Sequence, residues 1–173
     1  DTPTADEQAP DPTSPSTTDM EETEEMTEES AASGEGLFEI VQAESEVRFI
    51  LDELLGGNPK TVIGVTDQVA GQIEVNFETP GDSRVGTILI NARTLKTDSG
   101  NRNRMINNEI LDTEDYEFIE FTPASIIGMP DTITMGQPFT FSITGDLTIR
   151  SITNSVTFEV TVTPESETRI SGS

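Results

Sequence analysis

Apolar and polar side chains alternate in four segments of the chain. The clearest example is QIEVNF over residues 72–77, and the same pattern recurs over residues 47–52, 139–144 and 156–163. Successive side chains of a β-strand point to opposite faces, so each segment can bury one face and expose the other. One-sided alternation is typical of antiparallel sheets with a single buried face. The sequence therefore predicts an all-β domain.

One stretch departs from this alternation. Over residues 102–111, Met, Ile and Leu side chains recur at the spacing of an α-helix. Asp98 or Ser99 can accept hydrogen bonds from the first backbone amides of that helix. Residues 112–115 are typical of a second capping turn. We therefore expect one or two short helices between strands, covering one end of the sheet.

The first 36 residues differ from the rest of the chain in charge and composition. They hold 12 of the 33 acidic residues, none of the nine Lys and Arg residues and no aromatic residue. A segment of this kind buries too little apolar surface to offset its ordering entropy. We predict that residues 1–36 form a disordered acidic spacer rich in Pro, Thr and Glu, and that residues 37–173 form the domain. The spacer is either a tether or a solvated tail without a partner.

Composition excludes several function classes. The chain has no Cys and no His, so it has no Ser-His-Asp triad and no thiolate or imidazole zinc site. Its net charge of −24 repels nucleic acid. No run approaches the roughly 18–20 apolar residues that span a bilayer. The carboxylates of residues 112–117 match no EF-hand loop and are interpreted as helix-capping and solvated groups. We expect no enzymatic activity, no catalytic residue, no metal site and no nucleic-acid partner.

Two segments resemble a known family. Residues 95–121, LKTDSGNRNRMINNEILDTEDYEFIEF, resemble the central signature of the YceI-like, polyisoprenoid-binding family, with a turn, a charged helix, a second turn and a strand. Residues 143–160, ITGDLTIRSITNSVTFEV, are close to that family's GDLTIRGVT hairpin. The resemblance covers about residues 38–163. The chain departs from the family at Glu117 and Ser151, where Pro and Gly are usual. It also stops where family domains continue for about two strands, so we expect the C-terminal strands to be missing.

The resemblance implies an antiparallel lipocalin-like β-barrel, of about eight strands when complete, whose apolar cavity holds an isoprenoid chain. A barrel of that size is just wide enough for packed side chains or one slender ligand. The aromatic residues either line the cavity or fill a packed core. The predicted cavity residues lie mainly on the alternating strands: Phe49, Leu51, Ile73, Val75, Phe77, Ile88, Ile90, Phe121, Phe139, Phe141, Ile143 and Phe158.

Four basic residues are candidates for binding a lipid head group: Arg93, Lys96, Arg102 and Arg104. They lie within twelve residues of each other in a chain with nine bases, and guanidinium groups pair well with phosphate. The alternative is that they neutralise nearby carboxylates such as Asp98.

These observations leave two functions open. The first is binding or carriage of a polyisoprenoid lipid, either an isoprenoid quinone or a polyprenyl phosphate, with no cofactor besides that lipid. The second is a non-catalytic structural or interaction domain with a solid core, displayed on an acidic stalk in the cell envelope. For both we expect an extracytoplasmic location, in the periplasm or cell envelope of a bacterium, with a secreted or lipid-anchored precursor.

Overall fold

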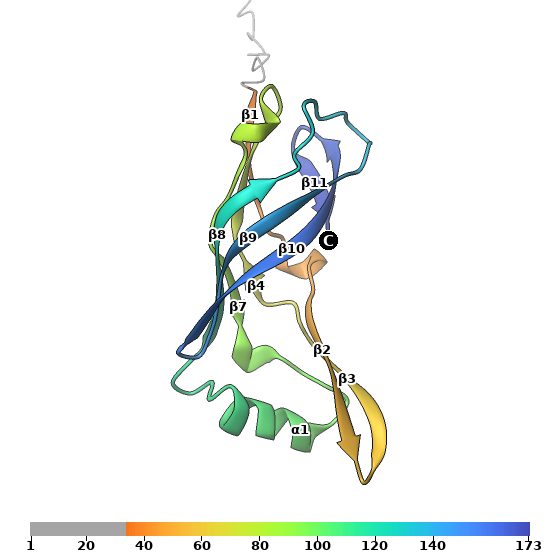
Figure 1. Cartoon of the computed structure of the whole chain (residues 1–173), viewed down its shortest axis with the longest axis vertical. Coiled ribbons are helices and arrows are strands. Elements are labelled where there is room, and N and C mark those ends of the chain that lie inside the picture. Colours follow the sequence, from red (N-terminus) through yellow and green to blue (C-terminus); the bar gives the residue numbers. More distant parts are fainter. Residues whose placement is uncertain (1–33) are drawn as a thin grey trace, which may run out of the picture. The chain divides into compact units, whose positions relative to one another are not determined.

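The computed structural model describes residues 34–173. The spacer predicted for residues 1–36 therefore lies almost entirely outside the described residues. The strands of the domain (Figure 1) are β1 (Glu35–Glu39), β2 (Val47–Leu55), β3 (Asn58–Thr66), β4 (Val69–Ala70), β5 (Gln72–Asn76), β6 (Arg84–Val85), β7 (Ile88–Asn91), β8 (Phe118–Ile127), β9 (Phe139–Ile149), β10 (Ile152–Ser166) and β11 (Arg169–Gly172). The helical elements are α1 (Gly100–Met105), the π-turn η4 (Ile106–Ile110) and three short 3₁₀ turns, η1 (Gln42–Glu44), η2 (Pro80–Asp82) and η3 (Ala92–Thr94).

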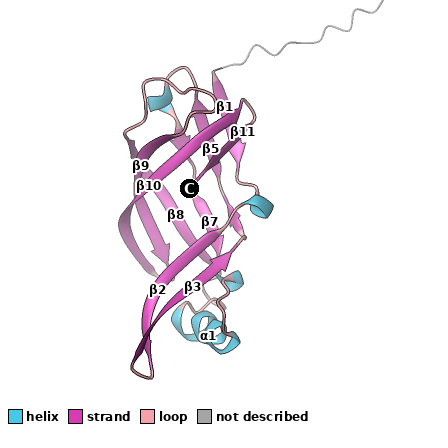
Figure 2. Cartoon of the chain, turned by 90° about the vertical axis from the view of Figure 1, so that its right-hand side faces the viewer, coloured by secondary structure: helices cyan, strands magenta, loops and turns pink. Residues whose placement is uncertain are grey.

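All strand pairs are antiparallel, as the alternation predicts. One sheet has the order β11-β10-β9-β8-β7-β4, a second has the order β1-β5-β6, and β2 and β3 form a hairpin. Gly71 alone separates β4 from β5, and two residues separate β6 from β7, so the first two sheets continue one another. Together they form the curled half-barrel that Figures 1 and 2 show. The last strand, β11, pairs with β10.

The concave face of this sheet is apolar and the convex face is polar. Phe121, Phe141 and Ile143 are buried in the central cluster of the concave face. On the convex face, threonine hydroxyls pair across β9 and β10 at three levels: Thr140 with Thr161 (3.1 Å), Thr144 with Thr157 (2.8 Å) and Thr148 with Thr153 (2.8 Å). The separation of apolar and polar side chains onto opposite faces, predicted for these strands, is therefore confirmed.

A β-bulge in β8 changes which residues face inward. The register of β8 against β9 shifts between Pro123 and Ser125. Before the shift Phe121 lies opposite Leu147, and after it Ile126 lies opposite Ile143. The extra residue of a bulge moves inward-facing positions from odd to even numbers. Simple alternation does not predict this change.

The α-helical part of the insertion is shorter than the apolar spacing of residues 102–111 suggests. The Ser99 side chain accepts the hydrogen bond from the backbone N–H of Arg102, so it caps α1 as expected. The α-helix ends at Met105 and continues as the π-turn η4, in which Leu111 N–H donates to Ile106 C=O at 2.7 Å. The wider turn brings Ile106 into the domain and leaves Met105 and Ile110 exposed.

Candidate functional site

The concave face holds most of the predicted cavity residues. Seven of the twelve lie on β7 to β10: Ile88, Ile90, Phe121, Phe139, Phe141, Ile143 and Phe158. Residues directly opposite each other in a ladder share a face, and Ile88 lies opposite Phe121 while Ile143 lies opposite Phe158. The Phe121 and Phe158 rings meet edge to face with centroids 5.1 Å apart.

This apolar face is open to solvent at two places along β10, at Phe158 and beside the turn between β9 and β10. Phe158 points inward and is nevertheless 45 % exposed. Ile149 and Ile152 lie opposite each other beside the turn, and Ile152 is 63 % exposed. Exposed apolar side chains that continue a buried cluster are a feature of binding grooves. We call the concave face of β7 to β10 the groove.

The strands β1, β5 and β6 extend the apolar face. Ile73 and Val75 alternate along β5, Phe77 follows its last residue in the same alternation, and Val75 is buried. Phe77 packs edge to face on the buried Phe38 with centroids 6.2 Å apart. Ile73 lies opposite Val85, which packs against the central cluster. These three predicted residues therefore lie on the same continuous face as the groove.

The remaining two predicted cavity residues, Phe49 and Leu51, lie on the hairpin. Phe49 lies opposite Gly64, and its ring occupies the space where a side chain at Gly64 would be. Leu51 lies opposite the fully buried Val62 but is itself exposed. Phe49 and Leu51 are thus on the inner face of the hairpin and are not part of the central cluster.

Two of the four head-group candidates form ion pairs with carboxylates of the same chain. Arg93 lies 3.3 Å from Glu117 and donates hydrogen bonds to two carbonyl oxygens of the turn after η4. Arg102 pairs with Glu53 at 2.7 Å and with Asp98. The hydrogen bond to Glu53 is the main cause that raises the pKa of Arg102 above its ordinary value.

The other two candidates are more available. Arg104 donates to the side-chain oxygen of Asn101 at 3.0 Å, and Lys96 bridges to Val65 through backbone hydrogen bonds. Within residues 34–173, neither side chain forms an ion pair. Of the four bases, Arg93 and Arg102 are therefore paired with carboxylates of the described chain, whereas Lys96 and Arg104 are not.

Arg150 is an organising residue that the sequence reasoning missed. It lies in the turn between β9 and β10 with a positive φ of 56°. Its guanidinium contacts Asp112 at 3.3 Å, donates to the carbonyl oxygen of Ile110 at 3.1 Å and lies 5.6 Å from the centre of the Tyr116 ring. These contacts tie the open end of the groove to η4. The signal was present in the GDLTIR motif, whose last residue is Arg150.

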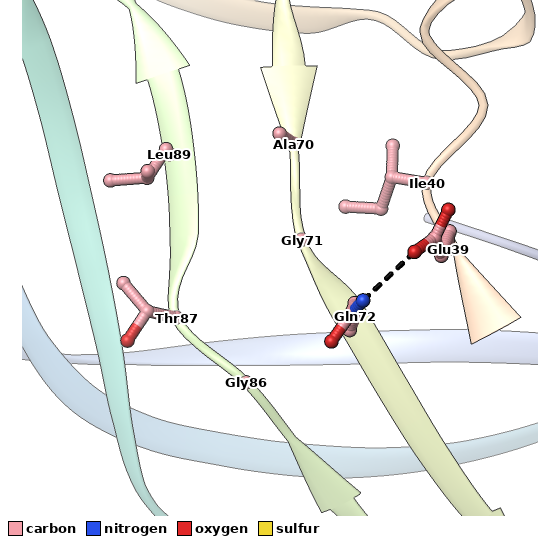
Figure 3. Close-up of a pocket in the computed structure, with 8 residues that line it drawn as sticks. All are labelled: Glu39, Ile40, Ala70, Gly71, Gln72, Gly86, Thr87 and Leu89. Carbon is pink, nitrogen blue, oxygen red and sulfur yellow. Dashed lines mark hydrogen bonds between the residues drawn. The ribbon is translucent and has the colours of Figure 1, made fainter. Parts of the chain in front are cut away.

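Two shallow cavities lie away from the twelve predicted cavity residues. The first, of about 380 Å³, lies where β4 meets β5 and β6 meets β7; Figure 3 shows its lining residues Glu39, Ile40, Ala70, Gly71, Gln72, Gly86, Thr87 and Leu89. Gln72 donates to Glu39 at 2.8 Å across it. The second, of about 440 Å³, is lined by Glu46, Val65, Thr66, Asp67, Gln68, Thr94 and Lys96. Lys96 is the single predicted site residue among these two sets.

Neither metal chemistry nor a spanning helix is indicated in the described part of the chain. Among residues 34–173, no three His, Cys, Asp or Glu side chains are grouped so that they could hold a metal ion. In the same range, no helix has the length and apolar character needed to cross a membrane.

Comparison with known proteins extends the resemblance to the C-terminus. The family model of the YceI-like domain matches residues 38–173. The crystal structure of BcnA from Burkholderia cenocepacia is similar with a TM-score of 0.53 and 18 % identity, over 72 % of this chain and 70 % of that one. A polyisoprenoid binding domain from Saccharophagus degradans, implicated in plant cell wall breakdown, is similar with a TM-score of 0.54 and 14 % identity, over 78 % of this chain and 71 % of that one. No curated protein matches the chain.

Proposed function

This chain belongs to the YceI-like domain family, and from that premise we propose that it binds a polyisoprenoid lipid, either an isoprenoid quinone or a polyprenyl phosphate. The observation that carries the proposal is the groove, where the inward-facing side chains of Phe158 and Ile152 are exposed. The family and the similarity to a polyisoprenoid binding domain support lipid binding in general. The choice of an isoprenoid ligand is the part that needs a test.

The groove suits a long apolar chain better than a compact polar molecule. It is lined by Phe, Ile, Leu and Val side chains from four neighbouring strands, and its hydrogen-bonding backbone groups are used within the sheet. Each CH₂ group that an apolar ligand buries there contributes roughly 0.8 kcal/mol. A branched hydrocarbon chain gains affinity from such a surface in proportion to its buried length. The protein's role is then to bind the lipid without chemical change.

The second candidate is a domain with a solid core that binds no lipid. It is favoured by the close packing of Phe121 against Phe158. The two candidates differ in one respect that can be measured, because a solid core leaves no apolar site that a quinone can enter.

The experiment uses tryptophan fluorescence, because the chain has no Trp of its own. Phe158→Trp places a single fluorophore on the groove, and Thr157→Trp places the matched control on the convex face one residue away. A soluble isoprenoid quinone should quench the first variant saturably and the second only weakly. Mass spectrometry of an organic-solvent extract identifies any lipid that co-purifies. Equal quenching of both variants, or no quenching of Phe158→Trp, would contradict the proposal.

The proposal includes an extracytoplasmic location, in the bacterial periplasm or cell envelope. The acidic composition of residues 1–36 motivates it. Cell fractionation of the native host tests it, and recovery of the protein with cytoplasmic markers would contradict it.

A further inference from the structure

The curled sheet has two edges that no backbone ladder joins. Within residues 34–173, β1 pairs only with β5, and β11 pairs only with β10. Because the sheet of β5 continues into the sheet of β7 to β10, β1 is the last strand on one side and β11 is the last strand on the other. A complete barrel pairs its first and last strands and so removes both edges. Here one side of the curled sheet is left without strand pairing.

The strand β11 covers only one end of β10. Their ladder runs from Val162 to Ser166, and the backbone N–H and C=O of Thr161 bond to Ser173. In an antiparallel strand, alternate residues direct these groups to the same edge, so residues 153, 155, 157 and 159 direct theirs to the edge that Thr161 uses. No strand among residues 34–173 pairs with them there. We call residues 152–160 the free edge of β10.

The groove is exposed along this free edge. The inward-facing side chains of Ile152 and Phe158 are exposed, whereas Pro164, where β11 covers β10, is fully buried. Proteins commonly protect a sheet edge with Lys, Pro or a bulge. Residues 152–160 contain neither Lys nor Pro, and the bulge of β10 lies beside β11, between Pro164 and Ser166. The free edge is therefore an unprotected side of the groove.

An ion pair joins the two edges of the sheet at one end of this side. Arg169 of β11 contacts Glu44 of η1 at 2.7 Å, and η1 begins three residues after the end of β1. Figure 1 shows η1, in orange, close to the C-terminal end of the chain. The same guanidinium contacts Glu165 of β10 at 2.7 Å, on its own side of the opening. We call the contact between Glu44 and Arg169 the clasp.

The two ends of the free edge are held with different strength. Both side chains of the clasp are more than half exposed, and exposed ion pairs contribute little to stability and are screened by salt. At the other end, Arg150 contacts Asp112, the carbonyl oxygen of Ile110 and the Tyr116 ring together. The end beside β11 therefore opens more easily than the end beside η4.

We propose that an isoprenoid chain enters the groove sideways, across the free edge of β10, and that the clasp controls this entry. The inference rests on the proposed function, because it supplies the route by which that ligand reaches Phe158. A chain that threads in from one end is ordered before most of its contacts form, and this ordering costs free energy. A chain that enters sideways forms contacts along its length as it becomes ordered. Opening of the clasp widens the route, and its closure slows entry and exit alike.

The first test breaks the clasp and measures the rate at which a soluble isoprenoid quinone quenches Phe158→Trp. Adding Glu44→Gln removes the contact across the opening and should speed quenching by about two- to fivefold. The matched control is Glu165→Gln, which removes the other partner of the same guanidinium without touching the opening, and the rate should not change. An unchanged rate in Glu44→Gln, or equal acceleration by both variants, would contradict the proposal.

The second test closes the clasp covalently. The chain has no Cys, so Glu44→Cys with Arg169→Cys introduces the only two thiols. A short bismaleimide that joins them should slow quenching of Phe158→Trp at least about tenfold, with little change in affinity, because entry and exit slow together. The matched control joins Thr140→Cys and Thr161→Cys, which lie opposite each other on the convex face, and should leave the rate unchanged. Equal rates in the two cross-linked proteins would overturn side entry.

These measurements separate the route from the proposed function. If quenching saturates in every variant but its rate never depends on the clasp, side entry is wrong and lipid binding stands. A clasp that only stabilises the fold would lower the urea midpoint of Glu44→Gln without changing the rate, which also refutes the route. If Phe158→Trp is never quenched, the proposed function fails and side entry fails with it.

Discussion

Replacing Gly145 with alanine tests the packing at the centre of the groove. Gly145 is buried in β9, opposite Pro123 of β8 and Val156 of β10. A Cβ atom there would lie 2.8 Å from Pro123 Cα and 2.9 Å from Phe121 Cε2, and it would also meet the carbonyl oxygen of Thr122. Two of these three contacts are with backbone atoms, which cannot rotate away. Either β8 moves away from β9 or the Phe121 ring leaves its position.

The magnitude follows from these contacts. Overpacking a core costs about 1–3 kcal/mol, and losing an edge-to-face pair such as Phe121 with Phe158 costs about 0.5–1.5 kcal/mol. Alanine loses less backbone entropy on folding than glycine does, which offsets roughly 0.5–1 kcal/mol of this cost. We expect Gly145→Ala to lower the free energy of unfolding by about 2 kcal/mol, which corresponds to a shift of the urea midpoint of about 1 M.

Equilibrium urea unfolding measures this change, and Gly81→Ala is the matched control. Nothing lies within 4 Å of a Cβ atom at Gly81, so the alanine should leave stability unchanged or raise it by up to about 1 kcal/mol. If both variants lose stability equally, or if Gly145→Ala is as stable as the parent chain, the close approach of β8 and β9 is wrong.

Two further predictions concern the register and the acid response. Val75→Asp buries an unpaired carboxylate and should cost several kcal/mol in urea unfolding, whereas Glu74→Lys on the other face of β5 should cost under about 0.5 kcal/mol; similar losses would refute the register of β5. The hydrogen bond and the charge of Lys60 lower the pKa of Asp98. The stabilisation from the Lys60–Asp98 ion pair, which links the hairpin to the residues before α1, is therefore fully present at pH values above the ordinary pKa of an aspartate. It is lost as the pH falls through the lowered pKa of Asp98. An NMR titration of Asp98 should show the pKa rising towards its ordinary value in Lys60→Met, and an unchanged value would contradict the pairing.

The candidate site was predicted in part. The alternating residues of β5, β9 and β10 lie on one apolar face, because side-chain direction in a strand depends only on position along it. Val75 and Phe141 are buried and Thr140 is exposed, as alternation requires, although Glu74 is half-buried. The grouping of four bases within twelve residues was visible in the sequence, but the carboxylates that pair with Arg93 and Arg102 were not all predictable from it. Arg102 pairs with Glu53, 49 positions away, and no local pattern reports such a pair.

The sequence by itself determined the class of the fold, the position of the helical insertion and the family. Each of these depends on local periodicity, on capping residues or on short motifs, which are properties of neighbouring residues. Only the tertiary structure decided where the sheet bends, where the bulge of β8 changes the inward-facing residues and which apolar side chains stay exposed. Alternation alone does not predict exposure. Phe141 is buried, whereas the side chain of Phe158 is 45 % exposed and that of Leu54 is 76 % exposed. The exposure of a side chain depends on which other segments pack against it, and those segments lie far away in the sequence.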